Sequence, residues 1–360
     1  MDIVILNASL ETVKVLDAFE SFIWTERFSE YGDFELYLPM EPDVFNYIKQ
    51  DYYVTIKDSN RVMIIETISI ESDVENGTRL CVSGRSLESI LERRIVWKQT
   101  ALSGNFQNGV KKLLDENLIS PTDSSRRVSE FYFSASTDPK ITKLTASAQF
   151  TGDNLYDAVK KLCDATGLGF KVTLGTINGA DKFIFELYSG IDRSYEQIEN
   201  PYVIFSPSYE NLLTSNYLES SKNLKTVTLV AGEGEGSARK TSTATVAGGA
   251  GSGLYRRELF TDARDISQTV DGATLTNAEY AEQLTQRGSE KLSEYIYIKS
   301  FEAEAETTDS VYKYEKDYFI GDIVQMADGY GNTARSRITE VIRSESESGY
   351  SVYPTFTSIE

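Results

Sequence analysis

Carboxylates are the most obvious candidates for chemistry in this sequence, because 55 of its 360 residues are Asp or Glu. Glu302, Glu304 and Glu306 stand at alternate positions of a segment that has the pattern of a strand. A glycosidase needs two carboxyl groups on opposite sides of a sugar, roughly 5 to 9.5 Å apart. Alternate residues of a strand point to the same face. The spacing therefore favours a solvated row of negative charge, and a hydrolase that uses carboxylates alone stays open as an alternative.

Catalytic and metal-binding arrangements that need an imidazole are excluded by composition, because the chain contains no histidine. Ser-His-Asp and Cys-His catalysis, His-ligated zinc and haem with a proximal His all need an imidazole. Cys81 and Cys163 are the only cysteines and lie far apart, so we expect buried thiols rather than a disulfide or a metal site. We expect no enzyme, no cofactor and no bound metal.

Two charged segments in the last third could form contacts. Gly-Glu-Gly-Glu-Gly at 232–236 superficially resembles a phosphate loop, but it lacks the Gly-Lys-Ser/Thr ending and its glutamates would repel phosphate. Farther on, arginines and aspartates cluster at Arg256, Arg257, Asp262, Arg264 and Asp265. The planar guanidinium pairs well with carboxylates, which suits a contact between subunits. Ordinary surface pairs within one chain, which contribute little, explain the cluster equally well.

The net charge of −19 and the pI of about 4.6 argue against a protein that wraps DNA with a basic surface. An acidic surface is compatible with a duct that nucleic acid passes without sticking. The start of the chain lacks the cationic region of a signal peptide, and no apolar run approaches the ~20 residues of a membrane helix. We expect a soluble protein that is made in a cytoplasm, with no membrane segment.

The chain divides into three regions that must position these residues. Residues 1–97 contain short alternating strands separated by turn residues, which predicts a small antiparallel β-barrel. Residues 98–205 contain two amphipathic helices and a hairpin, which predicts an α+β middle of one or two small domains. Residues 206–360 return to strands and predict a second barrel, with a Gly-rich mobile loop at about 232–254 and a helix at about 277–295. The predicted fold class is therefore mainly β, with two related barrels flanking small α+β domains.

The two ends of the chain resemble each other. Residues 64–72 (IIETISIES) match residues 338–346 (ITEVIRSES) at Ile, Glu, Ile, Glu and Ser with a constant offset. A Val-containing strand precedes each segment, and Phe34-Glu35-Leu36 has a counterpart in Phe301-Glu302-Ala303. Chance similarity between two strand meanders is the alternative. Duplicated barrels have a geometric consequence, because three such chains can form a ring with near six-fold symmetry.

Several stretches, taken in order, resemble the phage tail hub proteins, both the N-terminal hub of siphophage tail-associated proteins and the hubs of contractile-tail baseplates. They are WTERFSEYGDFEL at 24–36, VSGRSLESILERRI at 82–95, VAGEGEG at 230–236 and YRRELFTDARDI at 255–266. The resemblance spans most of the chain and is weakest in the middle third. It implies a structural protein of the virion, at the tail tip or baseplate.

The resemblance also implies a set of partners. Three copies would form a ring that closes the distal end of the tail tube, adapts a six-fold tube to a three-fold tip and provides the channel for DNA ejection. The neighbours would be the distal tail or tail tube protein and other tail-tip, tape-measure or receptor-binding proteins. In this reading Glu302, Glu304 and Glu306 would line the channel, and DNA would pass without sequence-specific binding. Longer relatives carry lytic or receptor-binding modules beyond the second barrel, and we expect those activities on separate chains here. A β-rich glycan-binding module with exposed Tyr52, Tyr53 and Trp97 is the alternative.

Overall fold

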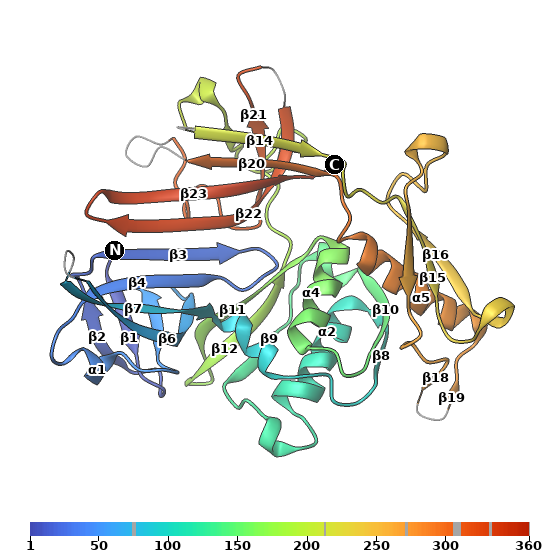
Figure 1. The fold of residues 1–360 in the computed structure, drawn as a ribbon, viewed down its shortest axis with the longest axis horizontal. Coiled ribbons are helices and arrows are strands. Elements are labelled where there is room, and N and C mark those ends of the chain that lie inside the picture. The colour runs from blue at the N-terminus through green and yellow to red at the C-terminus, as the bar shows by residue number, and fades with distance from the viewer. Residues whose placement is uncertain (74–76, 212–213, 271–272, 305–310, 331–332, 360) are drawn as a thin grey trace.

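The computed structural model describes residues 1–73, 77–211, 214–270, 273–304, 311–330 and 333–359. The fold is mainly β with a helical middle, as predicted (Figure 1). Strands from both ends of the chain lie side by side in one layer, and the helices gather around the middle of the chain.

The first quarter of the chain forms one half of a large antiparallel sheet. Its alternation is clear in β4, where Phe34, Leu36 and Leu38 are buried and the residues between them are not. A short helix, α1 (Val44–Tyr47), follows β4 and packs onto the same core. The strands are β1 (Ile3–Leu6), β2 (Thr12–Leu16), β3 (Ser21–Arg27), β4 (Asp33–Pro39), β5 (Tyr53–Ile56), β6 (Val62–Asp73) and β7 (Gly77–Ser86).

The middle of the chain is the predicted α+β region. The Asn154 side chain accepts a hydrogen bond from the amide of Tyr156 and caps α4, and Gly167 ends that helix in the left-handed conformation. The helices bury their apolar sides against the two small sheets β8–β10 and β11–β12–β9. The elements are η1 (Leu87–Arg93), β8 (Thr100–Asn105), α2 (Phe106–Leu114), η2 (Asp115–Ile119), η3 (Ser124–Arg126), β9 (Phe131–Ser134), α3 (Pro139–Thr142), β10 (Thr145–Phe150), α4 (Leu155–Thr166), β11 (Gly169–Ile177) and β12 (Ala180–Tyr188).

The last third contributes the other half of the large sheet. Its strands are β13 (Ile204–Phe205), β14 (Thr214–Ser220), β20 (Ile298–Glu304), β21 (Ile323–Ala327), β22 (Thr333–Ser346) and β23 (Gly349–Ser358), with η4 (Pro207–Tyr209) after β13. Phe205, Val324, Ile338 and Phe356 are at the centre of its core.

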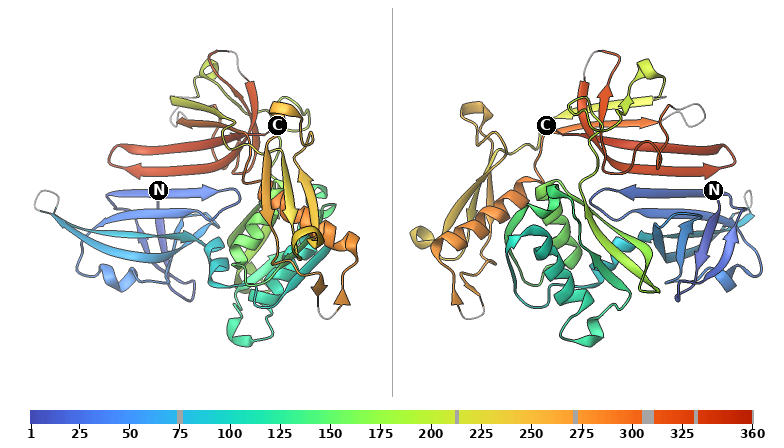
Figure 2. Two further views of the ribbon diagram at one scale, coloured as in Figure 1. Left: turned by 45° about the vertical axis from the view of Figure 1, so that its right-hand side comes forward. Right: turned by 180° about the vertical axis from the view of Figure 1, so that it is seen from behind.

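A separate three-stranded sheet is inserted between β14 and β20. It consists of β15 (Val227–Ala231), β16 (Thr241–Thr245) and β17 (Glu258–Asp262), and α5 (Asn277–Leu292) packs against it and against the middle region (Figure 2). The rest of the insertion contains η5 (Gly236–Ala238), η6 (Gly253–Tyr255), β18 (Thr269–Val270) and β19 (Ala273–Thr274). A capping box starts α5, because Thr276 and Glu279 each bond the backbone of the other. The prediction of a mobile loop over 232–254 is wrong in part, since β16 lies inside it and pairs with β15 along five residues.

The two ends of the chain share one continuous sheet. Its strand order is β14-β20-β23-β22-β3-β4-β7-β6-β5-β1-β2, with β21 beside β22 and β13 beside β21. The pairing of β22 with β3 joins the halves (Figure 1). Within the described residues no pairing closes either half on itself, so the structure has an open sheet of two halves where two closed barrels were expected. The three domain ranges stay predictions.

The halves repeat each other strand by strand. The order β3-β4-β7-β6-β5 corresponds to β14-β20-β23-β22-β21, and each pairing within one set has an antiparallel counterpart in the other. The β6–β7 ladder contains a bulge at Glu66, and the β22–β23 ladder contains a bulge at Thr339. A shared bulge at the same place in the same hairpin indicates duplication, because bulges are specific features of a strand pair.

These bulges correct the alignment that the sequence suggested. They place Ile65 opposite Gly84 and Ile338 opposite Phe356, so Ile65 corresponds to Ile338 and the offset is 273 residues. The sequence match uses Ile64 with Ile338, which is one residue out of register. A one-residue slip exchanges the two faces of a strand. The other two predicted matches, Phe34 with Phe301 and Val54 with Val324, agree with the strand pairing.

Candidate functional site at the junction of the two sheet halves

The junction is the antiparallel ladder between β22 and β3, which runs from Glu340 opposite Arg27 to Ser346 opposite Ser21. Arg27 donates to Glu340 at 2.7 Å and to Asp33 at 2.5 Å, on the face of the sheet away from the core. The amino terminus of the chain pairs with Glu345 at the other end of the ladder. Backbone pairing and ion pairs therefore fix one half of the sheet against the other.

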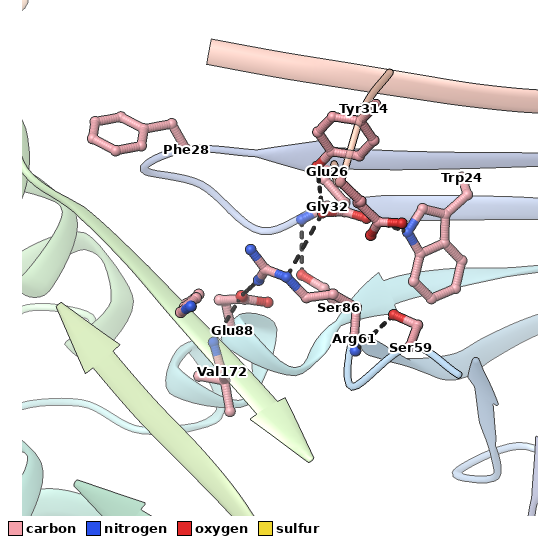
Figure 3. Close-up of polar contacts among 12 residues, drawn as sticks. Trp24, Glu26, Phe28, Gly32, Ser59, Arg61, Ser86, Glu88, Val172 and Tyr314 are labelled. Carbon is pink, nitrogen blue, oxygen red and sulfur yellow. Dashed lines mark hydrogen bonds and ion pairs between the residues drawn. The ribbon is translucent and has the colours of Figure 1, made fainter. Parts of the chain in front are cut away.

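A buried ion cluster lies on the core side of the same ladder, centred on Glu26. The Glu26 carboxylate accepts hydrogen bonds from Arg343 at 2.5 Å, from the Trp24 indole at 3.0 Å and from the Tyr314 hydroxyl at 3.0 Å. The Arg61 guanidinium lies 3.7 Å from the same carboxylate. The cluster thus takes residues from both halves of the sheet, and Figure 3 shows Tyr314 reaching down to Glu26.

The surroundings of Glu26 and Tyr314 determine whether each side chain is ionised. Burial by itself raises the pKa of Glu26, but the positive charges of Arg343 and Arg61 and the hydrogen bonds from Trp24 and Tyr314 outweigh it. The pKa of Glu26 is therefore lowered, and the carboxylate is ionised at neutral pH. Burial raises the pKa of Tyr314, and the neighbouring charge of Glu26 adds to this, so the phenol stays protonated and donates its hydrogen bond.

Arg61 extends the cluster to the middle region. It donates to Glu88 of η1 at 3.0 Å, and the same Glu88 oxygen accepts a hydrogen bond from the amide of Val172 in β11 at 2.8 Å (Figure 3). A continuous chain of contacts therefore joins the second half of the sheet, the first half and the α+β middle. Such a cluster needs all its members, because a buried charge without its partner is costly.

Phe28 adds an apolar contact to the same junction. It follows β3, yet its ring belongs to the core of the second half. The ring lies edge-on to Tyr188 with centroids 5.1 Å apart, and the Arg337 guanidinium stacks 4.4 Å from its centroid. A methyl group at Gly169 or Gly321 would lie 2.5 or 2.6 Å from this ring, so both positions need glycine for the ring to fit.

A cleft of about 900 Å³ opens beside the cluster, and Glu26, Arg61, Tyr188, Asp322 and Arg343 are among the residues that line it. Asp322 forms a buried pair with Arg193 at 2.8 Å. Two carboxylates of this cleft, Glu26 and Asp322, are thus each paired with a buried arginine. Among the described residues no group of three or more Cys, Asp or Glu side chains is placed to hold a metal. The arrangement is suited to holding parts of the chain together.

The predicted contact residues lie elsewhere, around β17 of the inserted sheet, and each has a partner within the chain. Arg256 pairs with Glu258 at 2.5 Å, Arg264 with Asp262 at 2.6 Å and Asp265 with Arg287 at 2.9 Å. Arg257 donates to the backbone of Ser221. Their role between subunits stays a prediction.

The predicted row of glutamates falls on β20. The backbone of Glu302 pairs with Asn216 on one side and Thr355 on the other, and Glu304 pairs with Thr214. Glu306 lies outside the described residues. Their position in a channel stays a prediction.

The aromatic residues of the glycan-binding alternative are not brought into one platform. Tyr52 packs against the core of the first half, and Tyr53 packs against Phe183 of the middle region. Trp97 is 64% exposed and stacks with Arg126 at 5.1 Å. Cys163 is buried as expected, and Cys81 is half-buried.

The buried cluster was not predicted, although the sequence contains a signal for it. Phe22 and Trp24 point into the core, so a strand with period two also points Glu26 inwards. On β22 the same reasoning turns Arg343 inwards after Val341. Residues of opposite charge at inward-facing positions of two strands are therefore the sequence signal for a buried ion cluster.

Comparison with known proteins decides the class of this chain. Residues 2–356 match the model of a family described as Siphovirus ReqiPepy6 Gp37-like protein. The chain belongs to this family. No helix among the described residues is long and apolar enough to cross a membrane. No curated protein matches its sequence.

Three solved structures share the fold over nearly the whole chain, each covering 99% of it. They are prophage tail protein gp18 from Listeria monocytogenes (TM-score 0.56, 14% identity, 94% of that chain), the prophage MuSo2 43 kDa tail protein from Shewanella oneidensis (0.57, 13%, 98%) and a tail protein from Neisseria meningitidis (0.56, 14%, 95%). At such identity the likeness concerns the fold alone.

Proposed function

We propose that this protein is a structural protein of the phage tail and forms the hub of the tail tip: three copies form a closed ring at the distal end of the tail tube and leave a central channel for DNA. The observation that carries the proposal is the duplicated sheet, whose halves are joined head to tail by β22 and β3. A head-to-tail contact between similar units produces a closed ring when the rotation between units closes. Six such units in three chains would adapt a six-fold tube to a three-fold tip.

The face of the sheet turned away from the core has the chemistry that a DNA channel needs. Arg27, Arg79 and Arg85 alternate with buried residues on β3 and β7, so they lie on this outer face. Each guanidinium forms an ion pair with at least one carboxylate at an N–O distance of 2.8 Å or less. The carboxylates are those of Asp33, Glu66, Glu71, Glu92 and Glu340. Guanidinium groups neutralised in this way offer little attraction to DNA phosphates, so DNA would slide rather than bind.

The strand repeat also supports a lumen position for two of the predicted glutamates. Glu302 and Glu304 occupy the positions on β20 that Glu35 and Tyr37 occupy on β4, and those two alternate with the buried Phe34 and Leu36. In the ring, the side chains at these positions of β4 and β20 would face the lumen. The neighbours in the particle would be the tail tube or distal tail protein and other tip proteins.

The test is the mass and shape of the purified chain. We expect native mass spectrometry to give three times the 40.3 kDa chain mass, and negative-stain electron microscopy to give three-fold rings with an open centre. A monomer at micromolar concentration would contradict the proposal. A solid disc without a central opening would contradict the channel.

A further inference from the structure

β6 is hydrogen-bonded along nearly its whole length on one side and only at its beginning on the other. β7 pairs with it from Met63 to Asp73, whereas β5 pairs only with Val62, Met63 and Ile64. In the described part of the chain, no strand lies beside residues 67–72 on the side of β5. Ile70, in the middle of this stretch, is 53% exposed. A long edge with an exposed apolar side chain is a site for pairing with another strand.

The second half of the sheet has the same stretch, and there it is covered. β21 pairs with β22 from Thr333 to Arg337, and β3 continues along the same side from Glu340 to Ser346. Arg343, the counterpart of Ile70 at the offset of 273, is 4% exposed. β3 therefore supplies in the second half what the first half lacks.

β14 is the counterpart of β3 and is the terminal strand of the sheet. Both strands have seven residues, and Tyr217 lies opposite Phe301 as Trp24 lies opposite Phe34. The described residues thus include one strand of the β3 type at the end of the sheet, and one stretch of β6 that lacks a strand of this type.

We propose that β14 of one copy pairs antiparallel with residues 67–72 of β6 in the next copy, in the register of the β22–β3 ladder. This register places Thr67 opposite Ser220, Ser69 opposite Leu218 and Ile70 opposite Tyr217. The inference rests on the proposed ring and specifies the contact that builds it. Every junction around the ring would then be of one kind, alternately within a chain and between chains.

The other terminal strand, β2, is the competing candidate, and the strand repeat argues against it. β1, which carries β2, pairs antiparallel with β5, whereas β13 pairs parallel with β21 at the corresponding place. The β1–β2 hairpin has no counterpart among the described strands of the second half, so the intrachain junction offers no template for it. A second copy of this chain at β14 is the occupant that the repeat supports.

A disulfide tests the register. In the intrachain ladder the side chains at the corresponding positions, Arg27 and Glu340, are in contact, so cysteines at Thr67 and Ser220 should meet between copies. β6 and β14 are seven strands apart along the sheet, or roughly 34 Å at ~4.8 Å per strand, so such a bond must be intermolecular. We expect T67C/S220C in a C81S background to give covalently closed trimers on mild oxidation. The control pair T67C/L229C, whose second cysteine lies on the separate β15 sheet, should stay uncrosslinked.

Charge substitution tests the edge itself. We expect I70K, and independently L218K on the opposing strand, to raise the dissociation constant of the assembly at least tenfold. V15K on β2 is the matched control, since Val15 is 50% exposed on the other terminal strand and the variant should assemble like the wild type. Both edge residues are exposed in the single chain, so circular dichroism and thermal unfolding should remain unchanged.

The possible results separate this inference from the proposed ring. A wild-type trimer that persists in I70K and L218K, without crosslinking of T67C/S220C, overturns the strand pairing and leaves the ring standing. Crosslinked open filaments support the pairing and overturn the trimer. A wild-type monomer that gives no crosslink overturns both.

Discussion

Replacing Glu26 by Gln should destabilise the protein by about 3 kcal/mol, because it removes the central negative charge of the junction. The carboxylate is 5% exposed and holds Arg343 at 2.5 Å and Arg61 at 3.7 Å. Arg61 keeps Glu88, whereas the carboxylate left to Arg343 among the described residues is Glu315, which is half-exposed and 3.0 Å away. Breaking a buried ion pair typically costs ~3–5 kcal/mol, and the amide retains part of the hydrogen bonding, which places the expected value at the lower end.

The measurement is urea unfolding followed by far-ultraviolet circular dichroism at pH 7, with E315Q as the matched control. E315Q removes the exposed partner of the same arginine and should cost less than ~1 kcal/mol. A loss for E26Q below ~1 kcal/mol, or equal to that of E315Q, would refute the reasoning.

The loss of stability in E26Q should also depend on pH. Because the pKa of Glu26 is lowered in the folded state, its contribution is fully present above the unfolded pKa of 4.5 and is lost as the pH falls through the folded value. The difference between wild type and E26Q should therefore shrink as the pH falls below 4.5. A difference that stays constant down to pH 3 would show that charge is not its cause.

Three further substitutions test other parts of the structure. F28A removes the ring that joins β3 to the core of the second half and should cost ~3–5 kcal/mol in unfolding free energy, measured by urea unfolding. G288V should lower the melting temperature in calorimetry, because a Cβ at Gly288 already lies 2.7 Å from Val230 and Ala244 where α5 packs on its sheet. G329V should not, because no described atom beyond its chain neighbours lies within 4 Å of a Cβ at that position. E290Q should stabilise the protein by up to ~3 kcal/mol at pH 8 and by little at pH 4. Burial raises the pKa of Glu290 to about 7, so the wild type loses stability as the pH rises from 4.5 through 7, and equal melting curves at pH 8 would contradict this.

The sequence was sufficient to predict a local feature wherever one short stretch contains all the residues that determine it. The helix at about 277–295 was predicted, and the capping box that starts it, Thr276 with Glu279, lies within three positions of the sequence. The strand β16 was missed because its five residues, Thr241–Thr245, lie among glycines that favour a loop, and its pairing partner β15 lies outside the predicted loop.

The duplication shows where sequence reasoning stops. The repeat was visible in matching letters, but the letters aligned Ile64 with Ile338, and the paired bulges align Ile65 with Ile338. Identity along one strand does not determine register, because register depends on the partner strand and on where the ladder takes an extra residue.

By itself, the sequence determined that the protein is mainly β, that its two ends resemble each other and that it has no histidine for imidazole-dependent chemistry, because composition and period are properties of the chain. Only the tertiary structure decided that the halves form one open sheet, that Glu26, Arg61 and Arg343 meet in a buried cluster, and that β6 and β14 have edges of complementary type. These features join residues about 35 to 320 positions apart, and no local pattern contains the geometry that brings such residues together.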